Sequence, residues 1–236
     1  MKAVILAGGK GTRMRPITYE IPKPLIPVHG RSLTEHLIDL LKKNGITDIV
    51  LSVGHLKERI MDYFGDGSKF KVNISYIVEE EPLGTAGPLK LGQKQHKMFS
   101  EPFVLTNGDE LKDFDLSGMI AFHKKHNAAA TIALLRVEDP SAYGVARLDG
   151  DRITEFVEKP KKEEAPSNLI NAGIYILDPA IIDMIPEGFS MIEKDIFPKL
   201  AAQRRLYGYE FKGQWFNTGN MQDYETAIKE WKDIKA

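Results

Sequence analysis

The sequence predicts an α/β fold of the Rossmann-like type, a three-layer sandwich with a mostly parallel mixed sheet and an inserted part rich in β-hairpins. Apolar runs of strand length alternate with amphipathic helical patterns as far as about residue 110. The first run, residues 2–6, leads straight into a turn with three glycines in four residues, as a strand buried in a parallel sheet would. Beyond residue 126 the strand patterns follow one another closely, and two of them meet at the turn Asp149-Gly150.

The first half alternates strands and helices. Its predicted strands share a short apolar pattern and lie at residues 2–6, 48–53, 72–78 and 103–106. The first helix should begin after Ser32, because Ser32 and Glu35 have the spacing of a capping box, and it should end at Gly45. Two further helical patterns lie at residues 56–64 and 85–95. In such sheets ligands bind beyond the carboxyl ends of the strands, where the glycine turn and Asn107-Gly108-Asp109 both fall.

The second half is richer in β-hairpins. Its predicted strands lie at residues 129–137, 145–148, 153–157 and 171–177. Its predicted helices lie at residues 115–126, 179–185, 192–203 and 221–231. No linker, repeat or low-complexity tract interrupts the chain, so residues 1–236 are predicted to form a single domain whose character changes near residue 110.

Composition excludes several classes of partner. Lys and Arg number 32 against 33 Asp and Glu, and this balance leaves no basic excess for nucleic acid or an anionic membrane. The absence of cysteine excludes a disulfide framework and thiolate metal sites. The apolar run at residues 3–7 is too short for a signal peptide, and no run approaches a membrane span. We therefore expect a cytoplasmic protein without nucleic-acid or membrane partners.

The glycine turn has the chemistry of a phosphate cradle. Gly8, Gly9 and Gly11 carry no Cβ, so the backbone there can take positive φ angles and turn successive N–H groups toward one anion. Arg13 and Lys23 follow closely and add full positive charge. The sequence thus predicts an anion site at the end of the first strand.

Two commoner glycine loops do not fit this spacing. A dinucleotide-binding fingerprint needs a third glycine where Met14 stands, and Pro16 and Pro22 prevent the helix that should follow, which disfavours an NAD-dependent dehydrogenase. A Walker A loop ends in Gly-Lys-Ser or Gly-Lys-Thr, whereas Gly9-Lys10 is followed by Gly11.

Residues 8–27 resemble the hallmark of the sugar-1-phosphate nucleotidyltransferases, also called nucleotide-sugar pyrophosphorylases. That hallmark reads G-G-x-G-T-R-(L/M)-x-P-x-T, followed by P-K-P-(L/M)-x-P, and the sequence matches it throughout. The resemblance implies that a nucleoside triphosphate and a sugar 1-phosphate react to a nucleoside diphosphate sugar and pyrophosphate. It also implies that the nucleotide binds the first strand, the turn and the P-K-P segment through Leu6, Ala7, Gly8, Gly9, Gly11, Thr12, Arg13 and Lys23.

Such a reaction needs cations rather than a general base, because the attacking phosphate oxygen is already ionised and two anions must meet. Arg13 and Lys23 are the candidate catalytic residues that hold the triphosphate and the leaving pyrophosphate. Asp109, at a strand end, is the third candidate and the predicted ligand of a bridging Mg²⁺. The family's second metal ligand is an aspartate in a W-x-D-x-G motif, which reads Trp215-Phe-Asn-Thr-Gly219 here, so Asn217 takes its place.

Base recognition is predicted at residues 79–86. The Glu79 carboxylate only accepts hydrogen bonds, and guanine offers two adjacent donors where uracil or thymine offers one, which favours GTP. The run Glu-Pro-Leu-Gly-Thr-Ala-Gly-Pro-Leu also resembles the mannose-1-phosphate guanylyltransferase branch of the family. With Glu79, the predicted nucleotide-binding residues on this side are Pro82, Gly84, Thr85, Ala86, Asn107 and Gly108.

Three motifs in the second half resemble sugar-binding motifs of the family in the same order: Tyr143-Gly144-Val145, Glu158-Lys159-Pro160 and Asn171-Ala172-Gly173. The implied sugar-phosphate-binding residues are Tyr143, Gly144, Glu158, Lys159, Asn171 and Trp215. Residues of about 1–110 would then form a nucleotide-binding half and about 111–236 a sugar-binding half. A homodimer is possible. The favoured sugar is mannose or a manno-configured heptose.

Two other functions stay open at this point. A uridylyl- or thymidylyltransferase acting on glucose 1-phosphate or an N-acetylated sugar 1-phosphate gains some support from Asn217, because similar uridylyltransferases have Asn there. The missing negative charge at Asn217 also leaves room for a catalytically inactive regulatory subunit that binds nucleotide sugars.

Overall fold

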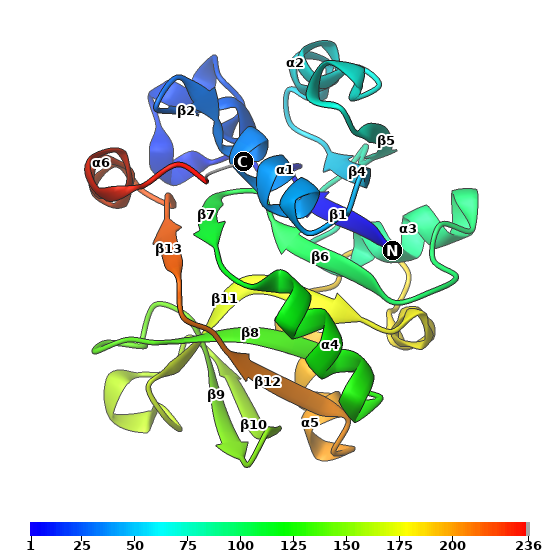
Figure 1. Ribbon diagram of the computed structural model, residues 1–236, viewed down its shortest axis with the longest axis vertical. Helices are drawn as coiled ribbons and strands as arrows, with labels where there is room; N and C mark the ends of the chain where they lie inside the picture. The colour runs from blue at the N-terminus through cyan, green and yellow to red at the C-terminus, as the bar shows by residue number, and fades with distance from the viewer. Residues whose placement is uncertain (235–236) are drawn as a thin grey trace. The chain divides into compact units, whose positions relative to one another are not determined.

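The computed structural model of the protein describes residues 1–234, and its internal contacts divide the chain into two units (Figure 1). Unit 1 consists of Met1–Pro82, Thr106–Leu116 and the chain from Gly213 on. Unit 2 consists of Leu83–Leu105 and Ser117–Lys212. The C-terminal segment therefore belongs with the glycine turn, although the sequence placed it in the other half. None of the helices in the described part of the chain is long and apolar enough to span a membrane.

Unit 1 contains the parallel sheet that the sequence predicts. Its strands β5 (Asn73–Val78), β4 (Asp48–Val53) and β1 (Lys2–Leu6) lie in that order, and Lys2 pairs with Asp48. Ala3, Val4 and Ile5 of β1 are fully buried, which explains the unbroken apolar run. The helix α1 (Leu33–Lys43) follows the short strand β3 (Arg31–Ser32), and α2 (Lys57–Phe64) follows β4. The predicted alternation of strands and helices is confirmed here.

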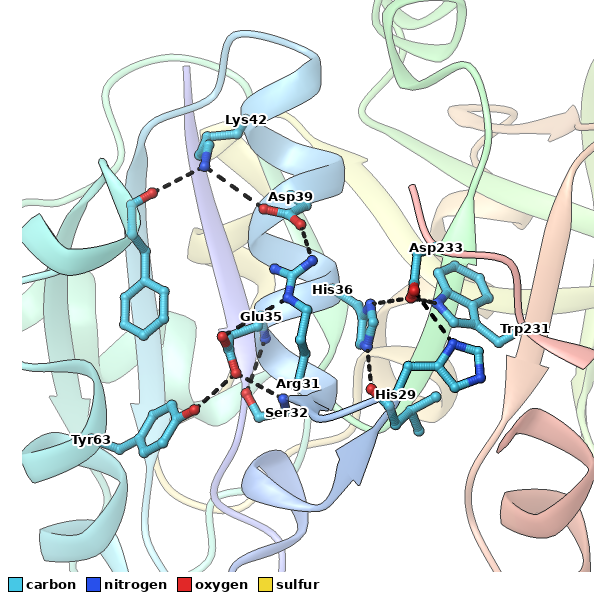
Figure 2. Close-up of polar contacts among 12 residues, drawn as sticks. His29, Arg31, Ser32, Glu35, His36, Asp39, Lys42, Tyr63, Trp231 and Asp233 are labelled. Atoms are coloured by element: carbon cyan, nitrogen blue, oxygen red, sulfur yellow. Dashed lines mark hydrogen bonds and ion pairs between the residues drawn. The ribbon is translucent and has the colours of Figure 1, made fainter. Parts of the chain in front are cut away.

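The start of α1 is the capping box expected from the sequence (Figure 2). The Ser32 hydroxyl accepts a hydrogen bond from the Glu35 backbone N–H at 3.2 Å, and the Glu35 carboxylate accepts one from the Ser32 N–H at 2.7 Å. The helix ends before Gly45, which has a φ of 73°. Both predicted ends of α1 are therefore confirmed.

Prolines break the segment after the glycine turn into short pieces. Three single 3₁₀ turns follow one another, η1 (Thr12–Met14), η2 (Ile17–Tyr19) and η3 (Lys23–Leu25), before the two-residue strands β2 (Pro27–Val28) and β3 (Arg31–Ser32). These turns project Arg13 and Lys23 from separate points of the chain. A continuous helix could not do this.

Like β2 and β3, two further short strands of unit 1 were not predicted. β7 (Glu110–Asp113) pairs antiparallel with β13 (Gln214–Asn217), and the closing helix α6 (Met221–Glu230) follows β13 (Figure 1). Each strand has four residues, and β7 has too many charged residues to show the apolar pattern of a strand. This ribbon joins the C-terminal segment to the residues directly after β6 (Phe103–Asn107).

Unit 2 is built on a ring of paired strands. β11 (Leu169–Leu177), β8 (Ala130–Arg136), β12 (Leu206–Glu210), β10 (Arg152–Glu158) and β9 (Gly144–Asp149) pair in that order, and β9 also pairs with β11. Only β8 and β12 run parallel, in keeping with the hairpin-rich character expected from the sequence. Strand β12 was not predicted, because Gly208 interrupts its pattern. A Cβ at Gly208 would lie 2.5 Å from the Leu134 side chain.

The helices of unit 2 differ partly from the prediction. The α-helices of this unit are α3 (Gly87–His96), α5 (Phe197–Ala202) and α4 (Leu116–His126), whose first residue belongs to unit 1. The helix predicted at 179–185 is a 3₁₀ helix over Pro179–Met184, and the helix predicted at 192–203 starts with a π-helical turn, Ile192–Ile196, which leads into α5. The β-branched isoleucines of both segments weaken their α-helical preference.

In unit 1, the residues after α6 pack against the start of α1 (Figure 2). Trp231 is buried and meets the His36 ring edge-on at 5.6 Å. Asp233 lies 3.4 Å from Nδ1 of His29 and 3.8 Å from Nδ1 of His36. Both rings point Nε2 at a backbone carbonyl, so Nε2 carries the proton and Nδ1 is bare in the neutral ring. Protonation of His29 therefore converts a contact between two acceptors into a charge-assisted hydrogen bond.

This arrangement predicts a pH-dependent contribution to stability. The Ile228 carbonyl and the Asp233 carboxylate raise the pKa of His29, whereas burial lowers the pKa of His36. A raised pKa in the folded chain gives stability that is complete below the unfolded pKa of about 6.5 and is lost as the pH rises through the folded pKa. We expect His29→Gln to have a lower free energy of unfolding than the wild type at pH 6. Urea unfolding should show the two converging by pH 9.

The exposed His96→Gln is the matched control, since His96 lies outside this cluster. A difference between wild type and His29→Gln that stays constant from pH 6 to pH 9 would contradict the predicted contact.

Candidate functional site

The glycine turn after β1 is shaped by its neighbours in unit 1. A Cβ at Gly8 would lie 2.7 Å from a Glu79 carboxylate oxygen. Gly11 has a φ of 60°, and a Cβ there would lie 2.9 Å from the Thr18 methyl group, while the Thr18 hydroxyl donates to the Gly11 carbonyl at 2.8 Å. Around the Cβ position of Gly9 no atom lies within 4 Å among the described residues. The turn is thus packed on two sides and open at Gly9, as a phosphate cradle must be.

Lys23 and Asp109 form an ion pair beside this turn. Lys23 lies between two prolines in η3, is 7% exposed and donates from Nζ to Asp109 Oδ2 at 2.7 Å. Burial tends to raise the pKa of Asp109. The Lys23 ammonium, and to a smaller extent Lys112 and Arg13, nevertheless hold that pKa below its ordinary value. Asp109 is therefore a carboxylate at neutral pH, with a side chain that is 40% exposed and accessible to a cation.

Arg13 reaches the end of β13. One of its terminal nitrogens lies 3.2 Å from the position that a Cβ at Gly219 would take. Asn217, two residues earlier, accepts from the Gly219 N–H at 2.8 Å and donates to Asp223 at 3.1 Å. The structure thus brings Arg13 next to the W-x-N-x-G segment, in which glycine leaves room for the guanidinium.

The two predicted metal ligands lie close together. Asn217 pairs with Glu110 across the β7–β13 ribbon, and the Thr218 hydroxyl and N–H both donate to the Asp109 carbonyl, at 2.7 and 3.3 Å. A carboxylate and an amide oxygen are ligands that Mg²⁺ accepts. No cluster of three or more His, Asp or Glu residues suited to a metal exists within residues 1–234. The donor set therefore fits an ion that keeps water and substrate phosphate in its shell.

Directly after Asp109 in the chain, Glu110 and Lys112 form a buried ion pair that the sequence did not predict. Lys112 on β7 is fully buried, donates to the Thr106 hydroxyl at 2.8 Å and lies 2.9 Å from Glu110. Burial raises the pKa of Glu110, and Lys112 opposes this shift. The run Glu-Leu-Lys-Asp reads as a solvated turn, and no sequence signal showed that its charges point inward.

A pocket of 610 Å³ opens beside the glycine turn. Residues 8–10 line one part of it and residues 79–82 another. Glu79 accepts a hydrogen bond from the Ser52 hydroxyl at 2.7 Å, which orients its carboxylate. His55 and Lys57 also line the pocket, although the sequence analysis assigned them no role. Predicted base-recognition residues and predicted phosphate-binding residues therefore share one cavity within unit 1.

The remaining predicted nucleotide-binding residues fall into two groups. In unit 1, the Gly108 N–H donates to the Leu6 carbonyl at 3.0 Å, and a Cβ at Gly108 would lie 2.4 Å from that oxygen, which ties the strand end before Asp109 to β1. Ala7 is buried, Thr12 is exposed at the start of η1, and Asn107 ends β6. Gly84, Thr85 and Ala86 belong to unit 2.

Five of the predicted sugar-phosphate residues gather in unit 2. The Lys159 N–H donates to the Tyr143 carbonyl at 3.0 Å, and the Glu158 carboxylate lies 2.8 Å from the Cβ position of Gly144. Burial, followed by the charge of Glu193, raises the pKa of Glu158. Asn171 is buried on β11. Trp215, the sixth, is half-buried in unit 1, where it pairs with Lys112 across the ribbon.

Comparison with known proteins decides the family. Residues 2–233 match the nucleotidyl transferase family model. The chain belongs to the nucleotidyl transferase family. This match covers nearly the whole chain, and it includes the glycine turn, Lys23, Asp109 and the segment around Asn217.

Members of this family resemble the chain in sequence and in fold. A mannose-1-phosphate guanyltransferase of Candida albicans is 43% identical over 228 residues, which are 95% of this chain and 62% of that protein. This chain thus spans less than two thirds of that relative. A putative glucose-1-phosphate thymidylyltransferase from Bacillus anthracis superposes with a TM-score of 0.90 at 29% identity, covering 100% of this chain and 97% of that one. HddC from Yersinia pseudotuberculosis, solved with GMP-PN, has a TM-score of 0.82 at 28% identity and coverages of 98% and 99%.

The predicted Rossmann-like fold is confirmed by these superpositions. The nucleotidyl transferases of this family generally use a divalent metal. Asp109 and Asn217 are the residues that the sequence predicts to bind such an ion.

Proposed function

We propose that this protein transfers a nucleotidyl group from a nucleoside triphosphate, with GTP favoured, to a sugar 1-phosphate of the mannose or manno-heptose type. The products are a nucleoside diphosphate sugar and pyrophosphate. Two observations carry the proposal: the 610 Å³ pocket that joins the open glycine turn to Glu79, and the Lys23–Asp109 pair, whose lysine packs against Gly11 of the same turn. Relatives at 40–43% identity that are named mannose-1-phosphate guanyltransferases support the same substrates.

The chemistry follows from the charges. A phosphate oxygen of the sugar 1-phosphate attacks the α-phosphorus, the bond between the α-phosphorus and its bridging oxygen breaks, and pyrophosphate leaves with the electron pair. The attacking oxygen is ionised, so no general base is needed. Arg13, Lys23 and the N–H groups of the glycine turn hold the triphosphate and stabilise the charge on the departing oxygens. A Mg²⁺ ion, when bound by Asp109 and Asn217, would supply further positive charge to the phosphates.

We assign base selection to Glu79. Its carboxylate lines the pocket beside Gly8 and is oriented by Ser52. Guanine presents N1–H and N2–H to such an acceptor, and hydrogen bonds to a charged group contribute about 1.5–3 kcal/mol. We expect Glu79→Gln to lower the ratio of kcat/KM for GTP over UTP at least about 10-fold. Steady-state pyrophosphate release with each triphosphate measures the ratio.

Glu81→Gln is the control for that variant, because Glu81 lines the same pocket and is exposed. An unchanged ratio in Glu79→Gln would remove Glu79 from base recognition.

A second candidate is a uridylyl- or thymidylyltransferase acting on glucose 1-phosphate or an N-acetylated sugar 1-phosphate. The superposition with the Bacillus anthracis protein and the amide at Asn217 favour it. A catalytically inactive regulatory subunit is the third, because Asn217 gives the metal one negative charge fewer. A cytoplasmic location and a homodimer stay predictions.

One experiment separates these functions. The protein is mixed with Mg²⁺, each of ATP, GTP, UTP and dTTP, and a panel of sugar 1-phosphates, and pyrophosphate release is measured. We expect the highest kcat/KM for GTP with mannose 1-phosphate or a manno-heptose 1-phosphate. A maximum with UTP or dTTP supports the second candidate, and no release with any pair supports the third.

A further inference from the structure

The Thr85 hydroxyl faces the interior of unit 2. It donates to Glu193 Oε2 at 2.6 Å and accepts from the Ile192 N–H at 2.9 Å. Sequence motifs place Thr85 in the segment predicted to bind the nucleotide. Its side chain is instead committed to the π-helical turn Ile192–Ile196, and π turns often occur at functional sites.

The backbone around Thr85 is clamped to the same turn. The Ala86 N–H donates to the Ser190 carbonyl at 2.9 Å, and the Ser190 N–H donates to the Leu83 carbonyl at 3.0 Å. Gly84 has a φ of 77°, and a Cβ there would lie 2.4 Å from the Ser190 carbonyl oxygen. Close approach of the two backbones therefore requires glycine at position 84. Thr85 cannot turn away without disrupting this docking.

Glu193 extends the contact to the predicted sugar-binding residues. It is 6% exposed, and its second oxygen accepts from the Tyr175 hydroxyl at 3.3 Å. The same Tyr175 oxygen accepts from the Asn171 side-chain amide at 2.8 Å, and Asn171 Oδ1 accepts from the Gly173 N–H at 2.9 Å. Tyr175 is fully buried. One hydrogen-bonded chain thus runs from Thr85 through Glu193 and Tyr175 to Asn171.

We propose that Thr85, Glu193 and Tyr175 are positioning residues of the sugar-phosphate site, which hold the Asn171 amide in the orientation that receives a sugar hydroxyl. Burying the Glu193 carboxylate against the hydroxyls of Thr85 and Tyr175 costs more free energy than apolar packing would. A purely structural role therefore explains this buried carboxylate poorly. The charge of Glu193 also acts on Glu158, another predicted sugar ligand. This inference rests on the proposed function, since it presupposes a sugar 1-phosphate.

The inference predicts that changing Thr85 weakens binding of the sugar 1-phosphate. The position of Thr85 in the sequence would instead suggest an effect on the nucleotide. Thr85→Val removes the hydroxyl at nearly constant shape, and Tyr175→Phe removes the link to Asn171. Loss of a hydrogen bond to a charged group corresponds to about 10-fold in affinity. We expect both variants to raise the KM for mannose 1-phosphate about 10-fold with the KM for GTP within about 3-fold of wild type. Thr85→Ser should restore the wild-type value.

Controls come from the same unit. Thr154→Val removes an exposed threonine hydroxyl from β10, and Tyr207→Phe removes the hydroxyl that contacts Arg152. Both should leave the two KM values near wild type. A Thr85→Val variant with a raised KM for GTP and an unchanged KM for mannose 1-phosphate would overturn the inference. So would equal rises in both KM values with a lowered melting temperature, since this indicates general loosening.

Calorimetry with mannose 1-phosphate keeps this test apart from that of the proposed function. If the wild type binds mannose 1-phosphate but releases no pyrophosphate with any pair, the proposed function fails while the inference is still tested. Binding about 10-fold weaker in Thr85→Val then supports it. Equal binding by both proteins, or no binding by the wild type, overturns it.

Discussion

Lys23→Met is expected to lower kcat/KM for the nucleotidyl transfer by about 10²- to 10³-fold, the effect of removing one pre-positioned donor from developing charge. Lys23 is the buried cation at the glycine turn, and its Nζ lies 2.7 Å from Asp109. Substrate phosphates would meet this ammonium without the cost of reorganising water. Steady-state pyrophosphate release with the best substrate pair measures the loss.

Lys43→Met is the matched control. Its Nζ pairs with Asp113 at 3.2 Å in the same unit, but the side chain is 46% exposed. An exposed pair of this kind contributes little, so activity and stability should both stay near wild type. If Lys23→Met keeps activity within about 3-fold of wild type while folding normally, the assignment of Lys23 to the phosphates fails.

Asp109→Asn is the second variant with a large expected effect. The substitution keeps the shape, removes the one negative charge predicted to face the metal and leaves the Lys23 ammonium unpaired. Because Asn217 is already neutral, an amide at 109 would leave no charged side chain among the two proposed ligands. We expect kcat to fall by about 10²-fold or more and the Mg²⁺ concentration for half-maximal activity to rise.

Titration of activity with Mg²⁺ and, separately, binding of Mn²⁺ in the presence of GTP followed by electron paramagnetic resonance measure these effects. Asp113→Asn, which breaks the control pair with Lys43, should change neither. Unaltered metal dependence in Asp109→Asn would show that the ion binds elsewhere.

Much of the fold could be predicted from short sequence patterns. The capping box at Ser32 and Glu35, the buried run of β1 and the prolines after the glycine turn each specify their local structure, and the structure follows them. These features depend on neighbours within a few residues, which sequence patterns report well. The conformation of Gly11 belongs with them, since a positive φ there needs glycine.

Long-range pairing was harder to predict. The four-residue strands β7 and β13 are stabilised by each other across more than 90 residues of chain, and neither is recognisable alone. The inward direction of Lys112 depends on the same pairing. The hydroxyl of Thr85 lies 2.6 Å from Glu193, a contact that no motif containing either residue signals. Residue types at the site were therefore predictable, but their partners depended on tertiary packing.

A crystal structure of the protein with Mg²⁺ and a non-hydrolysable GTP analogue would show whether the glycine turn, Lys23 and Asp109 bind the triphosphate and its metal. We expect the triphosphate on the N–H groups of residues 8–11, with Arg13 and Lys23 within hydrogen-bonding distance of its oxygens. The metal should lie on Asp109, and guanine should donate to Glu79. Phosphates bound away from the glycine turn and Lys23, with the Lys23–Asp109 pair intact, would contradict the assignment of these residues to the triphosphate.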